Sequence, residues 1–68
     1  MEKISTTKLK AAMIAAQIGV NALAKAADLQ PVTITRILKG DSEQVRFSTV
    51  GKLSRALNCS PDEILKED

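Results

Sequence analysis

The stretch VNALAKAADLQPVTITRILKG, residues 20–40, decides the fold because it contains two short amphipathic segments joined by a brief polar turn. The first segment, at about residues 20–27, repeats apolar side chains with helical spacing. The second begins at Pro31, which suits a first helical position because its missing N–H removes no bond. Gly40 is typical of the residue that ends a helix. Two short helices joined by so tight a turn form a helix-turn-helix.

Individual positions within this stretch agree with that geometry. Ala24 is the fifth residue, where the two helices cross closely and the side chain must be small. Asp28 is the ninth, where the turn requires a positive φ that Asp tolerates better than most residues. Leu29 is expected to be buried in the turn, and Ile34 and Ile37 to pack the later helix against the earlier one. Together, these positions support a helix-turn-helix over about residues 20–39.

A further helix is predicted before this stretch. Ser5 or Thr6 suits its N-cap, and Ile4 and Leu9 are spaced as a hydrophobic staple around that cap. Leu9 then begins the apolar repeat that Met13 and Ala16 continue. Gly19 either closes this helix or begins the next one.

Two more helices are predicted after a polar loop, DSEQVR. The fourth is expected from Ser48 to Leu57, with Phe47 just ahead of it and Asn58 as a left-handed stop. Residues 60–63, SPDE, form a capping box that is expected to begin a short fifth helix through Ile64 and Leu65. No alternating strand pattern is evident. We therefore predict an all-α fold of five helices in one domain, residues 1–68.

The composition argues against an enzyme and against a metal site. There is no His, and Cys59 is the only cysteine, so no intrachain disulfide can form. No set of residues resembles a catalytic centre, and Cys59 is expected to be a small buried residue. We expect no cofactor and no small-molecule ligand. These features suit a reducing, cytoplasmic setting.

No membrane association is expected from the sequence. No stretch reaches the roughly 18–20 apolar residues of a membrane span. An alternative reading takes the first residues as a secretory signal, but Gln17, Gly19 and Asn21 interrupt the apolar stretch.

Charge is distributed unevenly along the chain. Residues 1–58 contain nine Lys and Arg against four acids, a net +5, whereas residues 59–68 carry −3. This favours a polyanionic partner, although ordinary solvated surface charge explains the balance equally well.

The helix expected over residues 31–39 has an unusual outer face. At 100° per residue, Ile34 and Ile37 lie on one side, whereas Val32, Arg36 and Lys39 lie opposite. A helix that only faced solvent would carry Glu, Lys and Gln there. The mixture leaves open what this face contacts.

The segments ALAKAADLQPVTITRILKG and VRFSTVGKLSRALNCSPDEIL resemble the lambda-repressor-like, Cro/XRE class of helix-turn-helix regulators, in register over roughly residues 7–66. The resemblance implies sequence-specific binding of double-stranded DNA by a transcriptional regulator, expected to be a repressor. It also implies a homodimer on a two-fold operator, at least when bound to DNA, with the helix at 31–39 in the major groove. Any dimer is expected to form through the fourth and fifth helices.

The resemblance also implies which residues contact DNA. Arg36 has the strongest chemical case, because its guanidinium can bond O6 and N7 of guanine together. The positions expected to reach bases or adjacent phosphates are Gln30, Pro31, Val32, Thr33 and Arg36, and the candidates for phosphate contacts are Lys39, Arg46 and Asn21.

Each assignment has a simpler alternative. Arg36 can pack its stem along the helix surface, and Val32 can be a tolerated exposed apolar residue. Thr33 can merely fill the helix, Gln30 can cap it, and Arg46 can be a solvated loop charge. The residue types alone do not separate these roles.

The chain departs from the family pattern at two places. Val20 stands where many members have a phosphate-binding Gln, and Asp41 and Glu43 place negative charge in a loop that often approaches DNA. Both departures predict modest affinity for a single domain. A second hypothesis is an antitoxin-like or adaptor module that binds a protein, which would require an exposed apolar patch away from the third helix.

Overall fold

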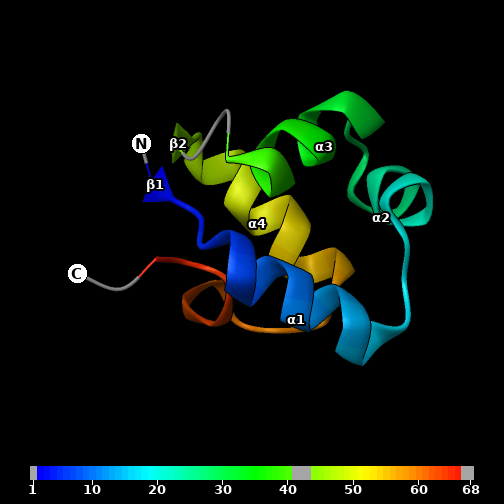
Figure 1. The fold of residues 1–68 in the computed structure, drawn as a ribbon, viewed down its shortest axis with the longest axis horizontal. Helices are drawn as coiled ribbons and strands as arrows, with labels where there is room; N and C mark the ends of the chain where they lie inside the picture. Colours follow the sequence, from blue (N-terminus) through cyan, green and yellow to red (C-terminus); the bar gives the residue numbers. More distant parts are fainter. Residues whose placement is uncertain (1, 41–43, 67–68) are drawn as a thin grey trace.

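The computed structural model describes residues 2–40 and 44–66, and Figure 1 shows their arrangement. The described residues form four α-helices, two strands of two residues each and one 3₁₀ turn: β1 (Glu2–Lys3), α1 (Thr6–Ala16), α2 (Val20–Ala27), α3 (Pro31–Lys39), β2 (Gln44–Val45), α4 (Phe47–Ala56) and η1 (Pro61–Glu63). The helices pack around one apolar core to which every α-helix contributes. The predicted helix-turn-helix at 20–39 is confirmed as α2 and α3.

The start of α1 follows the sequence prediction. Ser5 is the N-cap, and its hydroxyl accepts a hydrogen bond from the Lys8 N–H at 3.2 Å. Ile4 and Leu9, the predicted staple, are both buried. Of the apolar repeat along α1, Leu9 and Met13 are buried, whereas Ala16 is exposed.

Helix α1 ends before Gly19. Its C-cap is Gln17, which adopts a left-handed conformation with φ of 53°. Gly19 instead has an extended conformation and precedes α2 as its N-cap. Of the two roles left open for Gly19, the structure assigns it the second.

The turn between α2 and α3 depends on Asp28. Its φ is 57°, as predicted, and the following N–H of Leu29 donates to the Ala24 carbonyl at 2.8 Å. Ala24 is almost completely buried, and Ile34 and Ile37 have no exposed surface. Because these side chains fix α3 against the rest of the core, the opposite face of α3 is held outward in a defined orientation.

The predicted fifth helix is wrong, since only the turn η1 forms there. The capping box that starts it is present, and the Ser60 N–H donates to the Glu63 carboxylate at 2.7 Å. Beyond it the backbone pairs with the N-terminal segment: Leu65 forms a β-bridge with Ile4, and the Lys66 N–H donates to the Lys3 carbonyl at 2.9 Å. These long-range bonds draw the chain out of a helix after a single turn.

The expectation of a purely α-helical fold is also wrong in detail. β1 and β2 pair antiparallel, with Glu2 opposite Val45 and Lys3 opposite Gln44. Strands of two residues are too short to show an alternating pattern in sequence. Part of the DSEQVR loop is therefore a strand, whereas Asp41 and Glu43 lie outside the described residues.

Helix α4 was predicted to within one residue at each end. It begins at Phe47 rather than Ser48 and ends at Ala56 rather than Leu57. Asn58, the predicted left-handed stop, has φ of 54°. The buried side chains Val50 and Leu53 of α4, and Leu57 just after it, belong to the core, and α4 packs against α2 and η1.

Candidate nucleic-acid interface

Helix α3 lies along the upper edge of the molecule in Figure 1. One of its faces is buried and the other is open to solvent. Ile34 and Ile37 form the buried face. On the other side, Val32 exposes 51% of its surface, and Arg36 and Lys39 are also exposed. A large apolar side chain and two cations therefore share one accessible helical surface.

Three more of the predicted DNA-contact residues lie at the start of α3. Gln30 is the N-cap residue and Pro31 is the first helical residue, and both are exposed. Thr33 is half-buried on the flank. The Thr35 hydroxyl donates to the Pro31 carbonyl at 3.1 Å, so this side chain is engaged within its own helix. Five of the eight predicted positions thus lie within the first two turns of α3 or directly before it.

Two of the other predicted contacts lie at the starts of neighbouring helices. Asn21 is the second residue of α2 and is exposed, and Arg46 is the exposed N-cap residue of α4. The third, Lys39, is the last residue of α3. The structure therefore places Asn21 and Arg46 outside α3 and Lys39 on its outer face.

Phe47 was not assigned a role from the sequence. It is the first residue of α4 and exposes 70% of its surface, directly after Arg46. A single exposed apolar side chain is common on protein surfaces, and Ile14 on α1 exposes the same 70%. What distinguishes Phe47 is its place beside Arg46, one of the predicted contacts. Its position next to an exposed arginine was the only sequence signal available.

The N-terminal ends of α2, α3 and α4 share one feature. Within residues 2–40 and 44–66, none of these three ends has a side-chain cap or an acidic residue in its first turn. The first backbone N–H groups of a helix are left without intrahelical partners, and the helix dipole favours a negative ligand at that end. Open N-termini of this kind are suited to phosphate groups.

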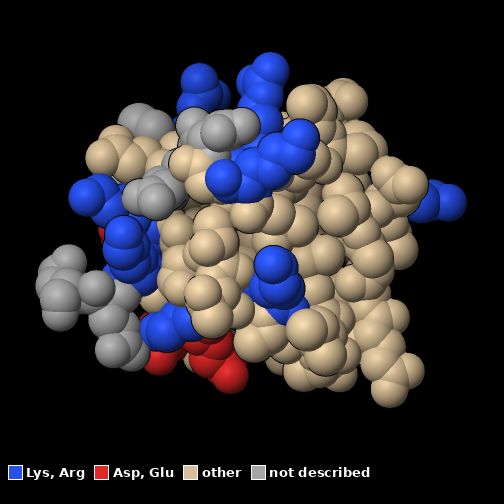
Figure 2. Space-filling view, viewed as in Figure 1, with Lys and Arg blue, Asp and Glu red and all other residues tan. Residues whose placement is uncertain are grey.

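Positive charge is spread over much of the visible face. Figure 2 shows Lys and Arg along the upper and left edges, and also near the centre and at the right edge, whereas Asp and Glu gather mainly at the lower left. The upper edge is the side on which α3 lies in Figure 1. Positive charge is therefore present on the side of α3 without being confined to it.

Other kinds of site find little support in the described residues. These residues contain no cluster of three or more His, Cys, Asp or Glu side chains able to hold a metal ion. Cys59 is half-buried at the end of α4, and its pKa is raised by burial and then by the charges of Glu63 and Asp62. In the part of the chain that the structure describes, no helix has the length and apolarity needed to cross a bilayer.

Comparison with known families shows what kind of domain this is. Residues 8–67 match the profile of the Cro/C1-type helix-turn-helix DNA-binding domain. The chain belongs to this family. It is a DNA-binding transcriptional regulator, as the sequence resemblance implied, and its family is one of regulators rather than of enzymes.

A solved structure supports this assignment. The chain is similar to the P22 c2 repressor protein, solved in complex with the synthetic operator 9T in the presence of Tl⁺. The two share 30% sequence identity with a TM-score of 0.78, over 93% of this chain and 94% of that chain. The search of curated proteins gave no match.

Proposed function

We propose that this regulator recognises a specific operator by placing α3 in the major groove, and that it acts there as a repressor. The observation that carries the proposal is the two-sided packing of α3. Ile34 and Ile37 are fully buried, whereas Val32, Arg36 and Lys39 are held outward with no partner among the described residues. The resemblance to the P22 c2 repressor, whose structure contains a synthetic operator, supports the same role.

Arg36 is assigned to base recognition and Val32 to contact with a thymine methyl group. Arg36 is exposed in the last turn of α3, where its guanidinium can donate to O6 and N7 of a guanine. Gln30, Pro31 and Thr33 would lie at the base edges or the nearest phosphates, because helices of this motif enter the groove with their N-terminal end.

Phosphate contacts are assigned to the surrounding residues and helix ends. Asn21, Lys39 and Arg46 would contact the backbone together with free N–H groups at the starts of α2 and α4. At α3 only the Val32 N–H would take part, because Pro31 has no N–H and the Thr33 N–H donates to the Gln30 carbonyl at 3.0 Å. The exposed ring of Phe47 would pack against the deoxyribose next to the phosphate that Arg46 contacts. These contacts fix the position of α3, whereas Arg36 and Val32 supply the specificity.

Selection from random duplex DNA at two salt concentrations tests the proposal. The wild-type protein should enrich one sequence motif, and the Arg36→Ala variant should lose discrimination at one base pair by about 1–3 kcal/mol. Lys10→Ala is the control, because Lys10 is also an exposed helical cation but lies on α1, which carries neither an assigned DNA contact nor the assigned dimer contact. If no motif is enriched, or if both variants behave alike, base recognition by α3 is excluded.

We also propose that the protein binds a two-fold operator as a homodimer. One α3 reads only a half-site, so a two-fold site requires two copies. The face formed by α4 and η1 is assigned to the contact between them. Sedimentation velocity with and without a selected duplex should show two protein chains on each DNA, whereas a single chain on a single half-site would exclude the dimer.

A further inference from the structure

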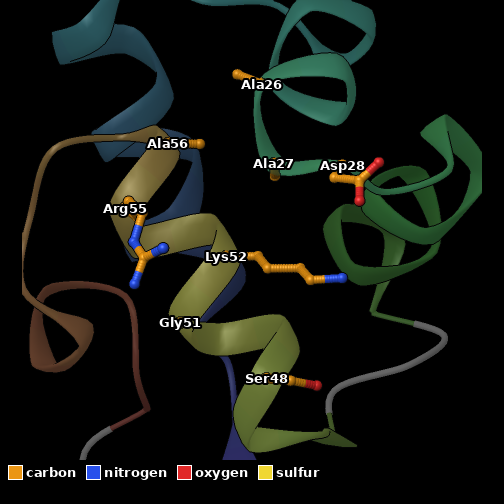
Figure 3. Close-up of a pocket in the computed structure, with 8 residues that line it drawn as sticks. All are labelled: Ala26, Ala27, Asp28, Ser48, Gly51, Lys52, Arg55 and Ala56. Atoms are coloured by element: carbon orange, nitrogen blue, oxygen red, sulfur yellow. The ribbon is translucent and has the colours of Figure 1, made fainter.

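A groove of about 550 Å³ lies between the C-terminal end of α2 and α4 (Figure 3). Small side chains, those of Ala26, Ala27 and Ala56, make up much of its lining, and Lys52 and Arg55 supply two cations. No groove residue belongs to the set assigned to DNA contact. A ligand in this groove would therefore leave the outer face of α3 free.

Gly51 is unexplained by the packing of the chain itself. It stands inside α4 and lines the groove, although glycine destabilises a helix interior relative to alanine. A Cβ atom placed on Gly51 would meet no atom within 4 Å, and its φ is not positive. Neither a close internal contact nor a special backbone conformation requires glycine here. Close approach by the backbone of another molecule would account for it.

The charges of the groove are also without partners. Lys52 and Arg55 are exposed, and neither forms an ion pair with a carboxylate of the described residues. In Figure 3, the Lys52 side chain extends toward the side of Asp28, whereas Arg55 extends from the other side of α4. The two cations thus flank the position of Gly51, and Asp28, the single acid of the lining, lies at one end.

We propose that the α2–α4 groove binds an acidic peptide segment of a partner protein, with its backbone against Gly51 and its carboxylates at Lys52 and Arg55. Carboxylates complement the unpaired cations, and a peptide can cover the alanine surface with its own apolar groups. A nucleic-acid backbone suits the groove less well, because its hydrated phosphates would not cover the apolar alanine surface. The regulator would then hold a protein partner beside the DNA that it occupies.

A titration with a defined peptide tests the charge requirement. The probe is a fluorescein-labelled synthetic peptide of Glu, Ala and Leu, and the same peptide with Gln in place of Glu is the uncharged control. We expect saturable binding of the Glu peptide, with NMR amide shifts concentrated at Ala26, Ala27 and Gly51. The double variant Lys52→Gln, Arg55→Gln should weaken binding by roughly tenfold or more. Lys10→Gln, a change at an exposed lysine of α1, should have little effect.

A second pair of variants tests the groove without altering charge. Gly51→Leu would fill the space above α4, whereas Gly51→Ala adds only one methyl group, and both residues favour a helix over glycine. Gly51→Leu should abolish saturable peptide binding and Gly51→Ala should retain it, while both bind the selected DNA duplex as the wild type does. This DNA control confirms that each variant is folded.

Three results would overturn the proposal. Gly51→Leu could bind the Glu peptide normally, or Lys10→Gln could weaken binding as much as the double variant. Displacement of the peptide by duplex DNA of unrelated sequence would assign the groove to the DNA backbone instead. Because the peptide titration is carried out without DNA, its outcome is independent of whether α3 recognises a specific operator.

Discussion

The helix starts of this molecule fall into two groups that differ in how their N–H groups are satisfied. At α1 and η1 a side chain completes the first turn: Ser5 caps α1, and the Glu63 carboxylate accepts from the Ser60 N–H. At α2, α3 and α4 the N-cap residues are Gly19, Gln30 and Arg46, and none of their side chains makes a cap bond. In Figure 1 the capped elements lie on the lower side, whereas α3 lies along the upper edge.

This difference separates stability from binding. A good N-cap stabilises a helix by about 1 kcal/mol, and small domains have little stability to spare, so three uncapped starts have a cost. All three belong to helices that carry residues assigned to DNA contact. A side-chain oxygen there would compete with a phosphate for the same N–H groups. The capped starts stabilise the fold, and the open starts remain available to the ligand.

The largest effect, on DNA affinity, is expected when a side-chain cap is added to a helix start that lacks one. Gly19→Asp would cap α2, since a Cβ at Gly19 meets no atom within 4 Å and its backbone is already extended. We expect stability to rise by a few tenths of a kcal/mol, as for other replacements of an N-cap glycine. DNA affinity should fall by about 1.5–3 kcal/mol, because a charge-assisted phosphate contact is lost. Urea unfolding and fluorescence anisotropy measure the two quantities.

Gly19→Asn is the matched control for this prediction. Asn caps as well as Asp but carries no charge, so it should stabilise α2 similarly and weaken DNA binding less. If Gly19→Asp stabilises the protein and leaves DNA affinity unchanged, the start of α2 does not contact phosphate.

A smaller effect of the opposite kind is expected at a capped start. Ser5→Ala removes the bond from the Lys8 N–H and should lower the free energy of unfolding by about 1 kcal/mol. DNA affinity should stay within the error of the measurement, since α1 carries none of the assigned contacts. Ser5→Asp, which retains a capping oxygen, should keep most of the stability. A loss of DNA affinity in the folded Ser5→Ala protein would mean that the two groups of helix starts are not separate.

The parts of this fold that could be predicted from sequence are those governed by local chemistry. Asp28 indicated the left-handed turn because few residues tolerate positive φ, and Ile34 indicated which face of α3 is buried. The prediction of a fifth helix was wrong although its local signal, the capping box, is present. The hydrogen bond from the Lys66 N–H to the Lys3 carbonyl, which follows the single turn, connects residues far apart in sequence and has no local signal.

The candidate site shows the same limit. The outer face of α3 follows from helical periodicity, so Val32 and Arg36 could be chosen in advance. The exposure of Phe47 depends on how α4 starts after β2, which no local pattern reveals. The absence of side-chain caps at the starts of α2, α3 and α4 could not be predicted as a shared feature either, because their N-cap residues, Gly19, Gln30 and Arg46, are of different types.

The contribution of Arg46 should be smaller than that of a helix start, because the side chain is exposed and screened by salt. Arg46→Gln should reduce the slope of log affinity against log salt by about 1 and weaken binding uniformly across sequences. Lys10→Gln, on α1, should leave the slope unchanged. If Arg46→Gln keeps the wild-type slope, Arg46 does not contact a phosphate and is an ordinary solvated charge.

The smallest effect on stability is expected at Cys59, next to the capped turn η1, whose acids raise the pKa of the thiol. Burial raises the pKa of the thiol above its ordinary value of 9.0, and Glu63 and then Asp62 raise it further. A group with a raised pKa in the folded state stabilises the protein below its unfolded pKa, and this contribution is lost as pH rises through the folded pKa. The free energy of unfolding should therefore decline at alkaline pH, above about pH 8.5–9, and Cys59→Ala should remove part of that decline.

Alkylation of the native thiol isolates the cause of this shift. Because the thiolate is the reactive form, iodoacetamide should react with Cys59 more slowly than with the unfolded chain at the same alkaline pH. Glu63→Gln keeps a side chain able to accept from the Ser60 N–H but removes the charge, so it should increase the rate by a modest factor and leave the effect of burial. Glu2→Gln, in β1, should not change the rate. A rate for Glu63→Gln equal to that of the wild type would mean that the Glu63 charge does not protect Cys59, and that Glu63 acts only as the cap of η1.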